Sequence, residues 1–390
     1  MKVLNLTGNA LKDSRGEYEY NLCKYLEESG IEIFDLALYG DNSNYCKNTK
    51  MAKKPLWFLP KKVGNFFSQD IFSEINKNYD IIHVHGPLWS PIPMQALIWK
   101  KILRKKTPII MTTHAYFPEK HIMMGPALRK AFFSGKFSLI LSAIKCLPYR
   151  RVDKIICHGD EEKEFIKNKF KINHSKIAVI PNGVDLRRFE QNNTYFIKKE
   201  EIQDKFTILY VGQLIKIKGV DYLIDAVLEL IKNSYEIILL IATYTHNSEI
   251  EKRIQENKLE KQIIILKDLK ENDLIAVYKN CDLFVLPSFT ESFSIVLLEA
   301  MTAKKPVIAT KIEGITSWVK DEFNGLLVNP GNSNEIKDAI KRIIEDKKLA
   351  ENISLNEYKM VRERYSWEII IKMIINEYEE LKKKYKEAIK

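Results

Sequence analysis

The chain has 390 residues, 45% of them hydrophobic and 29% charged, which is the balance of a soluble globular protein with a length that suits two domains. No apolar run approaches the ~20 residues that a membrane-spanning helix needs, and no signal peptide follows Met1, so we expect neither a membrane-spanning nor a secreted protein. The five cysteines lie far apart without a C-x-x-C pair, which favours reduced thiols in the cytoplasm over disulfides or a zinc site.

The net charge of +11 comes from one half of the chain. Residues 1–190 hold 31 Lys and Arg against 19 Asp and Glu, whereas residues 191–390 hold 31 against 32. We therefore expect an anionic partner for the first half, whether membrane lipid, phosphate or nucleic acid. Nucleic acid is the least favoured of the three, because no zinc-finger spacing, RNP-like strand or helix-turn-helix pattern accompanies the charge.

Strands alternate with helices along both halves, the pattern of doubly wound parallel sheets. In the first half the pattern predicts strands at residues 3–7, 31–36, 79–85, 108–113, 154–158 and 177–180, and helices at 17–29 and 93–104. In the second half it predicts strands at 206–211, 236–242, 263–266, 282–287, 306–310 and 325–328, and helices at 219–230, 249–257 and 271–279. The polar stretch 190–204 between the halves is the expected domain boundary.

The chain ends in a predicted long helix at residues 366–384, whose apolar stripe consists of Trp367, Ile370, Ile371, Ile374 and Tyr378. Two segments interrupt the alternation, at residues 41–70 and 119–150, and both interleave aromatic or aliphatic residues with Lys and Arg. Each segment is either an ordinary amphipathic helix packed on its own domain or an insertion in the first domain that contacts an acceptor or a membrane surface.

The segment from Leu286 to Met301 carries the most specific pattern of polar residues in the chain. A strand ends at Leu286, and a helix begins near Phe293 or Ser294 and continues to about Ala303. The free backbone N–H groups at the start of such a helix suit a bound phosphate, and ligands of parallel sheets bind at this edge. Glu299 in the helix could accept hydrogen bonds from a ribose, and Glu291 in the loop could contact a sugar. The alternative is that Glu291 and Glu299 are surface carboxylates beside a buried strand–helix turn and bind no ligand.

The spacing of Glu291 and Glu299, followed by Lys305-Pro-Val-Ile-Ala-Thr310, resembles the signature of retaining GT-B glycosyltransferases of family GT4. Other landmarks follow in the family's order along nearly the whole chain. These are Asp80-Ile-Ile-His-Val-His85, Thr112-Thr-His114, Ile180-Pro-Asn-Gly-Val-Asp185 with Phe189, Val211-Gly-Gln-Leu-Ile-Lys-Ile-Lys218-Gly219, Asn324-Gly-Leu-Leu-Val and Tyr365-Ser-Trp367.

The resemblance implies an α/β protein with the GT-B fold, in which two doubly wound Rossmann-like domains face each other across a cleft. Residues 1–190 would bind the acceptor and 191–365 the nucleotide-sugar donor, while the helix 366–390 would cross back and pack on the first domain. The implied enzyme is a retaining hexosyltransferase that uses a UDP- or GDP-linked sugar and a lipid-linked, saccharide or phosphorylated acceptor in glycan synthesis. It would need no cofactor or metal, and it would work in the cytoplasm, where the basic first domain could bind the anionic face of the membrane.

Roles for individual residues also follow from the resemblance. Glu291, His114 and Lys218 would be catalytic, through contacts with the donor sugar, the transferring sugar and the diphosphate respectively. Glu299 would bind the ribose, and the amides near Ser294 and Ile295 the diphosphate. The remaining donor-binding candidates are Gly212, Gln213, Phe293 and Gly16, where Gly16 stands alone in place of the family's paired glycines and Gly8 is a second candidate for the same close approach.

His83 and His85 alternate on one strand and so face the same side, which could suggest a metal pair. No third ligand is evident in the sequence, and we expect a structural role for them.

Two departures from the family pattern keep alternatives open. Gln213 stands where the family usually has an arginine beside the diphosphate, and Gln supplies no charge, although Lys216 or Arg15 could compensate. Thr316 and Ser317 replace the usual Pro-Glu. The alternatives to an active transferase are a binding-only subunit with a degenerate donor site and a sugar-nucleotide epimerase.

Overall fold

The structure is a computed structural model that describes residues 1–10, 17–40, 48–51, 68–86, 91–114, 148–190 and 205–388. The chain divides into two compact units, the first made of Met1–Pro181 and Ile370–Lys390 and the second of Asn182–Ile369. The division falls ahead of the stretch where we expected it. The reason is that Val184 pairs with Ser366 and Phe189 is buried in the core of the second unit, so residues from Asn182 onward already belong there.

The first unit is built on a seven-stranded sheet in the order β3-β2-β1-β4-β5-β6-β7, and every pair of neighbouring strands is parallel. The strands are β1 Lys2–Ala10, β2 Glu32–Gly40, β3 Thr49–Met51, β4 Ile81–His85, β5 Ile109–Thr112, β6 Lys154–Cys157 and β7 Ile177–Val179. The connecting helices are α1 Glu17–Glu28, α3 Gln69–Ile75, α4 Pro91–Ile102 and α7 Asp160–Phe170, followed by the 3-10 turn η2 His174–Lys176. The six predicted strands are present, and β3, α3 and α7 are additions that the sequence pattern did not reveal.

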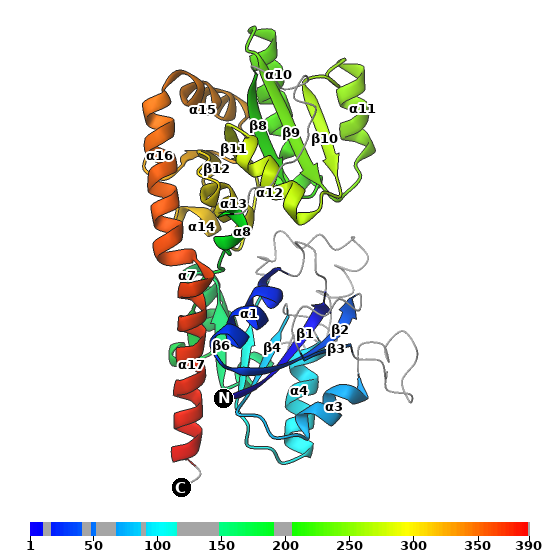
Figure 1. The fold of residues 1–390 in the computed structure, drawn as a ribbon, viewed down its shortest axis with the longest axis vertical. Coiled ribbons are helices and arrows are strands. Elements are labelled where there is room, and N and C mark those ends of the chain that lie inside the picture. The colour runs from blue at the N-terminus through cyan, green and yellow to red at the C-terminus, as the bar shows by residue number, and fades with distance from the viewer. Residues whose placement is uncertain are drawn as a thin grey trace. The chain divides into compact units, whose positions relative to one another are not determined.

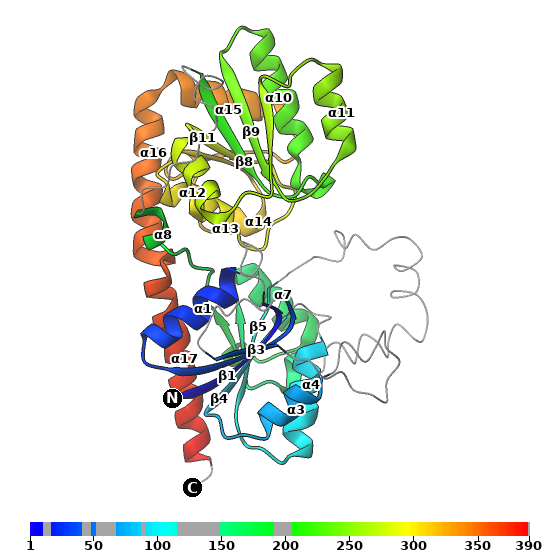
Figure 2. The same ribbon diagram turned by 45° about the vertical axis from the view of Figure 1, so that its right-hand side comes forward.

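Successive side chains of the central strands point to opposite faces of this sheet. Leu4, Leu6, Ile82 and Val84 join the apolar core that also contains residues of α3, α4 and α7. Their neighbours on the same strands point to the face that carries α1 and the C-terminal helix, and Figure 2 shows these helices on one side of the sheet with α3 and α4 on the other. The second face therefore receives polar residues at the carboxyl ends of β1 and β4.

The second unit contains a six-stranded parallel sheet in the order β10-β9-β8-β11-β12-β13. The strands are β8 Phe206–Val211, β9 Ile237–Thr243, β10 Ile263–Lys267, β11 Leu283–Leu286, β12 Val307–Thr310 and β13 Leu326–Val328. Its helical elements are α8 Arg187–Glu190, η3 Lys216–Lys218, α10 Val220–Lys232, α11 Ser248–Glu256, α12 Glu271–Asn280, α13 Ile295–Thr302, α14 Glu313–Thr316, α15 Ser333–Glu345 and α16 Lys347–Met360. The strands β8, β9, β11 and β12 are buried along most of their length, as expected of the middle of a parallel sheet.

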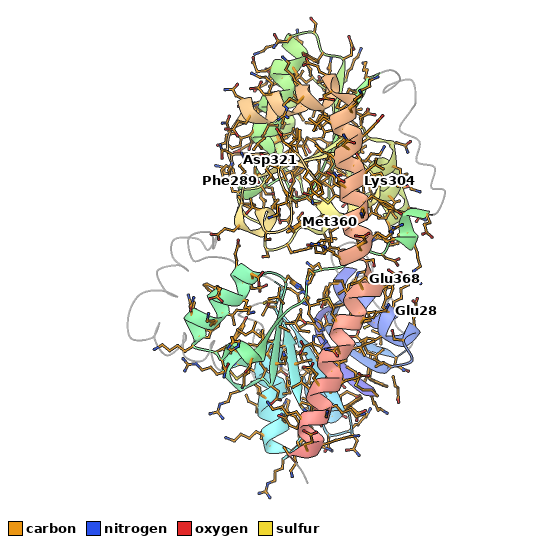
Figure 3. The ribbon with its side chains drawn as sticks, turned by 90° about the vertical axis from the view of Figure 1, so that its left-hand side faces the viewer. Glu28, Phe289, Lys304, Asp321, Met360 and Glu368 are labelled. Atoms are coloured by element: carbon orange, nitrogen blue, oxygen red, sulfur yellow. The ribbon has the colours of Figure 1, made fainter. Side chains whose placement is uncertain are left out.

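A nearly continuous helical run closes the chain, from α16 through the single π-turn η4 Val361–Tyr365 to α17 Trp367–Glu387 (Figures 1 and 3). The predicted apolar stripe of α17 is at most 4% exposed. Within the first unit, Tyr378 contacts His83, Lys382 pairs with Asp80, and Glu377 pairs with Lys154. The predicted return of the C-terminal helix to the first unit is therefore confirmed.

The two basic and aromatic segments, 41–70 and 119–150, lie mostly outside the described residues, which include only 48–51, 68–70 and 148–150 of them. Among the helices that the structure does describe, none combines the length and the apolar character that a membrane crossing requires.

Candidate functional site

In the second unit the predicted site residues gather at the carboxyl ends of β8 and β11. β8 ends at Val211, and the chain passes Gly212 and Gln213 before the turn that contains Lys218. β11 ends at Leu286 and leads through Glu291 to α13. Because β8 and β11 are parallel neighbours, these two loops emerge side by side, and the backbone amide of Phe289 donates to the carbonyl of Ile217 at 2.8 Å.

Lys218 and Glu291 form an ion pair between the two loops. Lys218 Nζ lies 2.7 Å from Glu291 Oε1, and the hydroxyl of Ser288 donates to the same oxygen at 2.7 Å. The side chains are 25% and 12% exposed, so the pair is partly shielded from water yet open to a ligand. It places one cation and one carboxylate at the sheet edge, where a phosphate and a sugar hydroxyl could each find a partner.

Two glycines allow the loops to approach this closely. Gly219 has a φ of 66°, and a β-carbon there would lie 2.1 Å from the carbonyl oxygen of Pro287. At Gly314, in α14, a β-carbon would lie 1.9 Å from the carbonyl oxygen of Glu291 itself. The backbone that carries Glu291 therefore rests directly on α14, a contact that any side chain at residue 314 would prevent.

Glu299 lies one turn into α13 and is buried. Tyr278 of α12 donates to its Oε2 at 2.9 Å, and Arg188 Nη1 lies 3.5 Å from its Oε1. Arg188 is also paired with Glu271, from its Nε at 2.6 Å. Burial raises the pKa of Glu299, and the charge of Arg188 opposes that rise. An arginine thus holds a buried carboxylate at the start of the helix.

The start of α13 offers unsatisfied donors next to these carboxylates. Ser294 is the N-cap residue and is 3% exposed, but its side chain makes no capping hydrogen bond and its buried Oγ has no partner among the described residues. The first amides of the helix, from Ile295 onward, have no intrahelical acceptor either. The ring of Phe293 stacks on that of Trp318 with the centroids 5.0 Å apart, so this side chain fixes the loop by packing.

Gln213 and Gly212 occupy the other side of the same edge. Gln213 donates from Nε2 to the hydroxyl of Tyr244, and its backbone carbonyl accepts from Tyr210 at 2.8 Å. A β-carbon at Gly212 would lie 2.8 Å from the Tyr210 hydroxyl, which explains why a glycine stands here. Lys216, the suggested substitute for the missing arginine, is exposed in the turn η3, whereas Arg15 lies outside the described residues.

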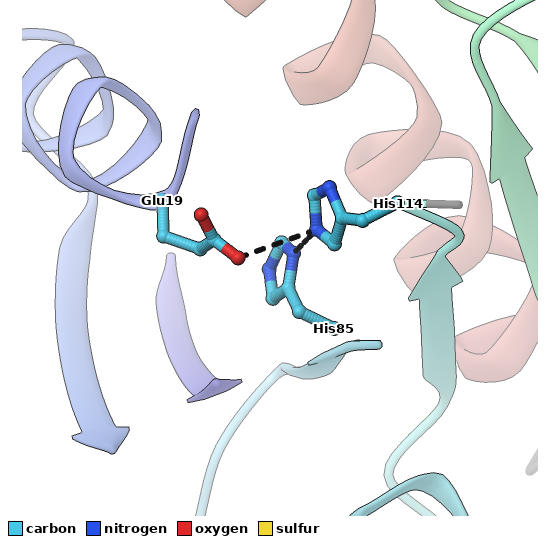
Figure 4. Close-up of side chains that lie close together, drawn as sticks. All are labelled: Glu19, His85 and His114. Atoms are coloured by element: carbon cyan, nitrogen blue, oxygen red, sulfur yellow. Dashed lines mark hydrogen bonds and ion pairs between the residues drawn. The ribbon is translucent and has the colours of Figure 1, made fainter. Parts of the chain in front are cut away.

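A second cluster lies in the first unit, at the carboxyl ends of β4 and β5, and consists of Glu19, His85 and His114 (Figure 4). His85 Nδ1 and His114 Nε2 are 2.9 Å apart, and Glu19 Oε1 lies 3.5 Å from the same His114 nitrogen. Burial lowers the pKa of His114 to about 4 and raises the pKa of Glu19 to about 7. The two rings are therefore neutral at physiological pH.

The three ligand atoms of this cluster all lie within 4.8 Å of one another, so a metal ion is a possibility to weigh. Two nitrogens of a tetrahedral zinc site, each about 2.0–2.1 Å from the ion, would be about 3.3 Å apart. The observed 2.9 Å is instead the distance of a hydrogen bond with one proton between the rings. The sequence did not indicate that Glu19 contacts the histidines, because a carboxylate on an amphipathic helix is normally exposed to solvent.

His83, the other histidine of β4, has a structural position. Its Nδ1 and Nε2 contact the hydroxyls of Tyr378 at 2.6 Å and Thr112 at 2.7 Å, and burial lowers its pKa to about 3. The predicted structural role suits these contacts for His83, whereas His85 belongs to the cluster with His114. Gly16 lies outside the described residues, and of Gly8 the structure describes only its place in β1.

The residues that sequence reasoning missed in the second unit are Arg188, Tyr278 and Ser288. Arg188 lies inside the quoted landmark from Ile180 to Phe189, between Asp185 and Phe189, so a signal was present. Tyr278 and Ser288 offered none: Tyr278 lies 21 residues before its partner Glu299, and Ser288, although only three residues before Glu291, is an ordinary loop serine.

Two family models match the chain, "Glycosyltransferase Family 4" over residues 16–188 and "Glycosyl transferases group 1" over residues 192–360. An uncharacterized glycosyltransferase of Methanocaldococcus jannaschii, MJ1069, is 26% identical over 367 residues, 90% of each chain. A second one, MJ1607, is 30% identical over 231 residues, which span 58% of this chain but only 59% of that relative. The Escherichia coli UDP-Gal:alpha-D-GlcNAc-diphosphoundecaprenol alpha-1,3-galactosyltransferase is 28% identical over 70% of this chain and 68% of its own.

Among solved structures, Anabaena Alr3699/HepE in complex with UDP and glucose aligns with a TM-score of 0.78 over 97% of this chain and 100% of its own. At 18% identity this likeness concerns the fold, and it confirms the predicted two-domain GT-B architecture. The two family models together account for most of the sequence, and the chain belongs to the family 4 glycosyltransferases with the GT-B fold.

Proposed function

We propose that the protein is a retaining glycosyltransferase that moves a hexose from a UDP- or GDP-linked donor to a lipid-linked or saccharide acceptor in glycan synthesis. The observation that carries the proposal is the pairing of Lys218 with Glu291 beside the open start of α13. Names of relatives support it, since one acts with UDP-galactose on a diphosphoundecaprenol-linked sugar and another, CapM of Staphylococcus aureus, belongs to capsular polysaccharide biosynthesis.

The transfer reaction requires stabilisation of the departing nucleotide diphosphate. The bond from the sugar C1 to the diphosphate breaks, its electron pair goes to the phosphate oxygen, and the acceptor oxygen forms the new bond to C1. The acceptor proton leaves with the phosphate. Lys218 and the amides of Ser294 and Ile295 would stabilise the developing negative charge, Glu291 would hold the sugar, and Glu299 would bind the ribose. His114, in the other unit, would meet the transferring sugar.

The nucleotide can be identified by thermal unfolding with UDP, GDP and ADP, using Glu299→Ala as the control. A ligand at 100 times its dissociation constant stabilises the folded state by about 2.7 kcal/mol, a shift of roughly 5–10 °C in Tm for a unit of this size. A shift for one nucleotide that disappears in the control supports the donor site. If no nucleotide shifts Tm, the binding-only subunit becomes the better account.

Gln213 is the feature that favours the binding-only alternative. An arginine at residue 213 would add the charge that the family usually has beside the diphosphate. We expect Gln213→Arg to tighten nucleotide binding modestly in a chain that already binds it. A rise from undetectable binding would instead identify a degenerate donor site.

We further propose that transfer proceeds without a metal cofactor. The nitrogens of His85 and His114 are already joined by a hydrogen bond, and the cation near the expected diphosphate is Lys218. Transfer should be as fast in EDTA as in magnesium or manganese. A loss of rate that zinc restores would point to the cluster of Glu19, His85 and His114.

Peripheral binding to an anionic membrane is proposed for the first unit. Around the end of α4, Ile98 and Ile102 are 41% and 59% exposed, and Lys101, Arg104 and Lys106 are exposed beside them without an acidic residue between 94 and 107. Exposed apolar and basic groups together suit an anionic lipid surface. Flotation with neutral and anionic vesicles tests this, and equal, salt-insensitive recovery with both would contradict it.

A further inference from the structure

Four buried or half-buried side chains form a line of hydrogen bonds that ends at His114. Asn5 Nδ2 lies 2.7 Å from Asp35 Oδ1, Asn5 Oδ1 lies 2.7 Å from His85 Nε2, and His85 Nδ1 lies 2.9 Å from His114 Nε2. Asp35, Asn5 and His85 are at most 1% exposed. Each link crosses from one element to another, from β2 to β1, then to β4, and then to the end of β5.

The hydrogen bond between Asn5 and Asp35 determines which atom donates in each of the other two hydrogen bonds. The amide nitrogen of Asn5 donates to Asp35 Oδ1, and the thiol sulfur of Cys23 at 3.8 Å from that nitrogen is a second weak acceptor. The amide oxygen of Asn5 then faces His85, so His85 carries its proton on Nε2. Burial lowers the pKa of His85 well below its usual value, and the neutral ring has only a lone pair left on Nδ1.

His114 must therefore donate its proton from Nε2 to His85. The other end of the line agrees, because the Glu19 carboxylate lies 3.5 Å from the same nitrogen and also favours a proton there. Nδ1 of His114 is left as the unprotonated nitrogen. Figure 4 shows it on the side of the ring that points away from Glu19 and His85, and no partner for it is found among the described residues.

The geometry points to a fixed role for this nitrogen: we infer that Asp35, acting through Asn5 and His85, holds His114 with an accepting Nδ1, so that the group bound there is a hydroxyl and not a phosphate or carboxylate. A lone pair accepts a hydrogen bond from a sugar hydroxyl, and it repels an anionic oxygen that has no proton to give. The identification of the ligand as a sugar hydroxyl rests on the proposed function, whereas the assignment of the His114 tautomer does not.

Asp35, Asn5 and His85 are accordingly positioning residues that act through His114. If the line were reversed, His114 Nδ1 would carry the proton and would suit an anion instead. The choice between sugar hydroxyl and phosphate at this edge would then depend on a carboxylate three side chains away from the ligand.

The test is nuclear magnetic resonance of the full chain labelled with ¹⁵N-histidine, recorded at pH 8, with His114→Gln to identify the ring signals. We expect an unprotonated Nδ1 and a protonated Nε2 for His114. In Asp35→Asn the carboxamide can donate or accept, so Asn5 can turn over and the His114 signals should move toward a mixture of tautomers. Asp153→Asn, a carboxylate of the same unit that contacts Ile109 and Lys100 instead, should leave them unchanged.

A protonated Nδ1 in the natural chain, or identical spectra for Asp35→Asn and Asp153→Asn, would overturn the assignment. For the ligand class, methyl α-glucoside and methyl α-galactoside should shift the Nδ1 signal, and glucuronate bound through its carboxylate should not. A larger shift with glucuronate or inorganic phosphate, or no shift with the neutral sugars at the highest soluble concentration, would overturn the hydroxyl assignment. Absence of transfer activity would count against the proposed function alone.

Discussion

Lys218 Nζ lies 2.7 Å from Glu291 Oε1, so the cation expected to meet a diphosphate is already paired with the carboxylate expected to meet the sugar. A donor that engages both residues must separate them, and each would exchange its protein partner for a group on the ligand. Under the proposed function the two members of the pair have different tasks. Substitutions at the two ends should therefore have different consequences.

Replacing Glu291 by Gln removes the charge that competes for Lys218. We expect UDP or GDP to bind as tightly as before or a few-fold more tightly, while transfer falls by 100-fold or more because the sugar loses its carboxylate. Calorimetric titration and a transfer assay on the same preparation separate the two effects. Glu313→Gln, at an exposed neighbouring carboxylate, is the control, and weaker nucleotide binding in Glu291→Gln would contradict the assignment.

Replacing Lys218 by Met should weaken nucleotide diphosphate binding by 10- to 100-fold, equivalent to about 1.4–2.8 kcal/mol. The corresponding nucleoside monophosphate should lose less, because the contact is with the diphosphate. Lys216→Met, in the same turn, is the comparison. An equal loss there would mean that Lys216 supplies the charge in place of the missing arginine at residue 213.

Replacing Gly314 by Ala should displace the loop that carries Glu291, since the new β-carbon would lie 1.9 Å from the Glu291 carbonyl oxygen. Steric insertions of this kind cost about 1–3 kcal/mol, and we expect a lower Tm together with a loss of transfer. Gly159→Ala adds a methyl group where nothing lies within 4 Å, so it should leave Tm unchanged or slightly raised. Full activity in Gly314→Ala would show that the loop tolerates the shift.

Glu19 should make stability depend on pH in a direction opposite to that of an ordinary carboxylate. Burial raises its pKa from 4.5 to about 7, so its contribution is complete below pH 4.5 and is lost as the pH rises through about 7. Between these values the free energy of unfolding of the natural chain should fall relative to Glu19→Gln by up to about 1.4 kcal/mol per pH unit. Urea titrations from pH 5 to 8 measure the difference, and parallel curves would place the Glu19 pKa near its usual value.

Sequence periodicity predicted the two sheets well because their central strands are rich in Val, Ile and Leu and are buried on both faces. It did not predict the short edge strand β3 or the helices α3 and α7, whose few buried residues carry no long pattern. The longer helices α15 and α16 were missed as well, although α15 has a stripe of buried residues at helical spacing. Glu291 and Glu299 were found from their places in the loop and helix after the strand that ends at Leu286, and Lys218 from the resemblance to family GT4. Their partners Arg188 and Tyr278 were not, because contacts between side chains far apart in the chain depend on how α8, α12 and α13 pack. Ser288 was missed because nothing in the sequence marks a loop serine as a donor to Glu291.

The buried links from Asp35 to His85 were hidden for a related reason. Asn5 and Asp35 each alternate with apolar residues on a strand, a pattern that normally assigns them to the solvent side. In this sheet that side is covered by α1 and α17, so the polar residues meet one another instead of water.

The helix α17 covers one face of the sheet that contains β1, so elements from opposite ends of the sequence belong to one unit. Tyr378 of α17 contacts His83 in the middle of the first sheet, and Lys382 pairs with Asp80. All of the second unit, Asn182–Ile369, lies in the chain between the strands of the first sheet and the α17 residues that cover it, so during synthesis this face stays uncovered until α17 has emerged from the ribosome. A chain that stops before α17 would therefore leave the face that carries Asn5 and His83 exposed to other proteins.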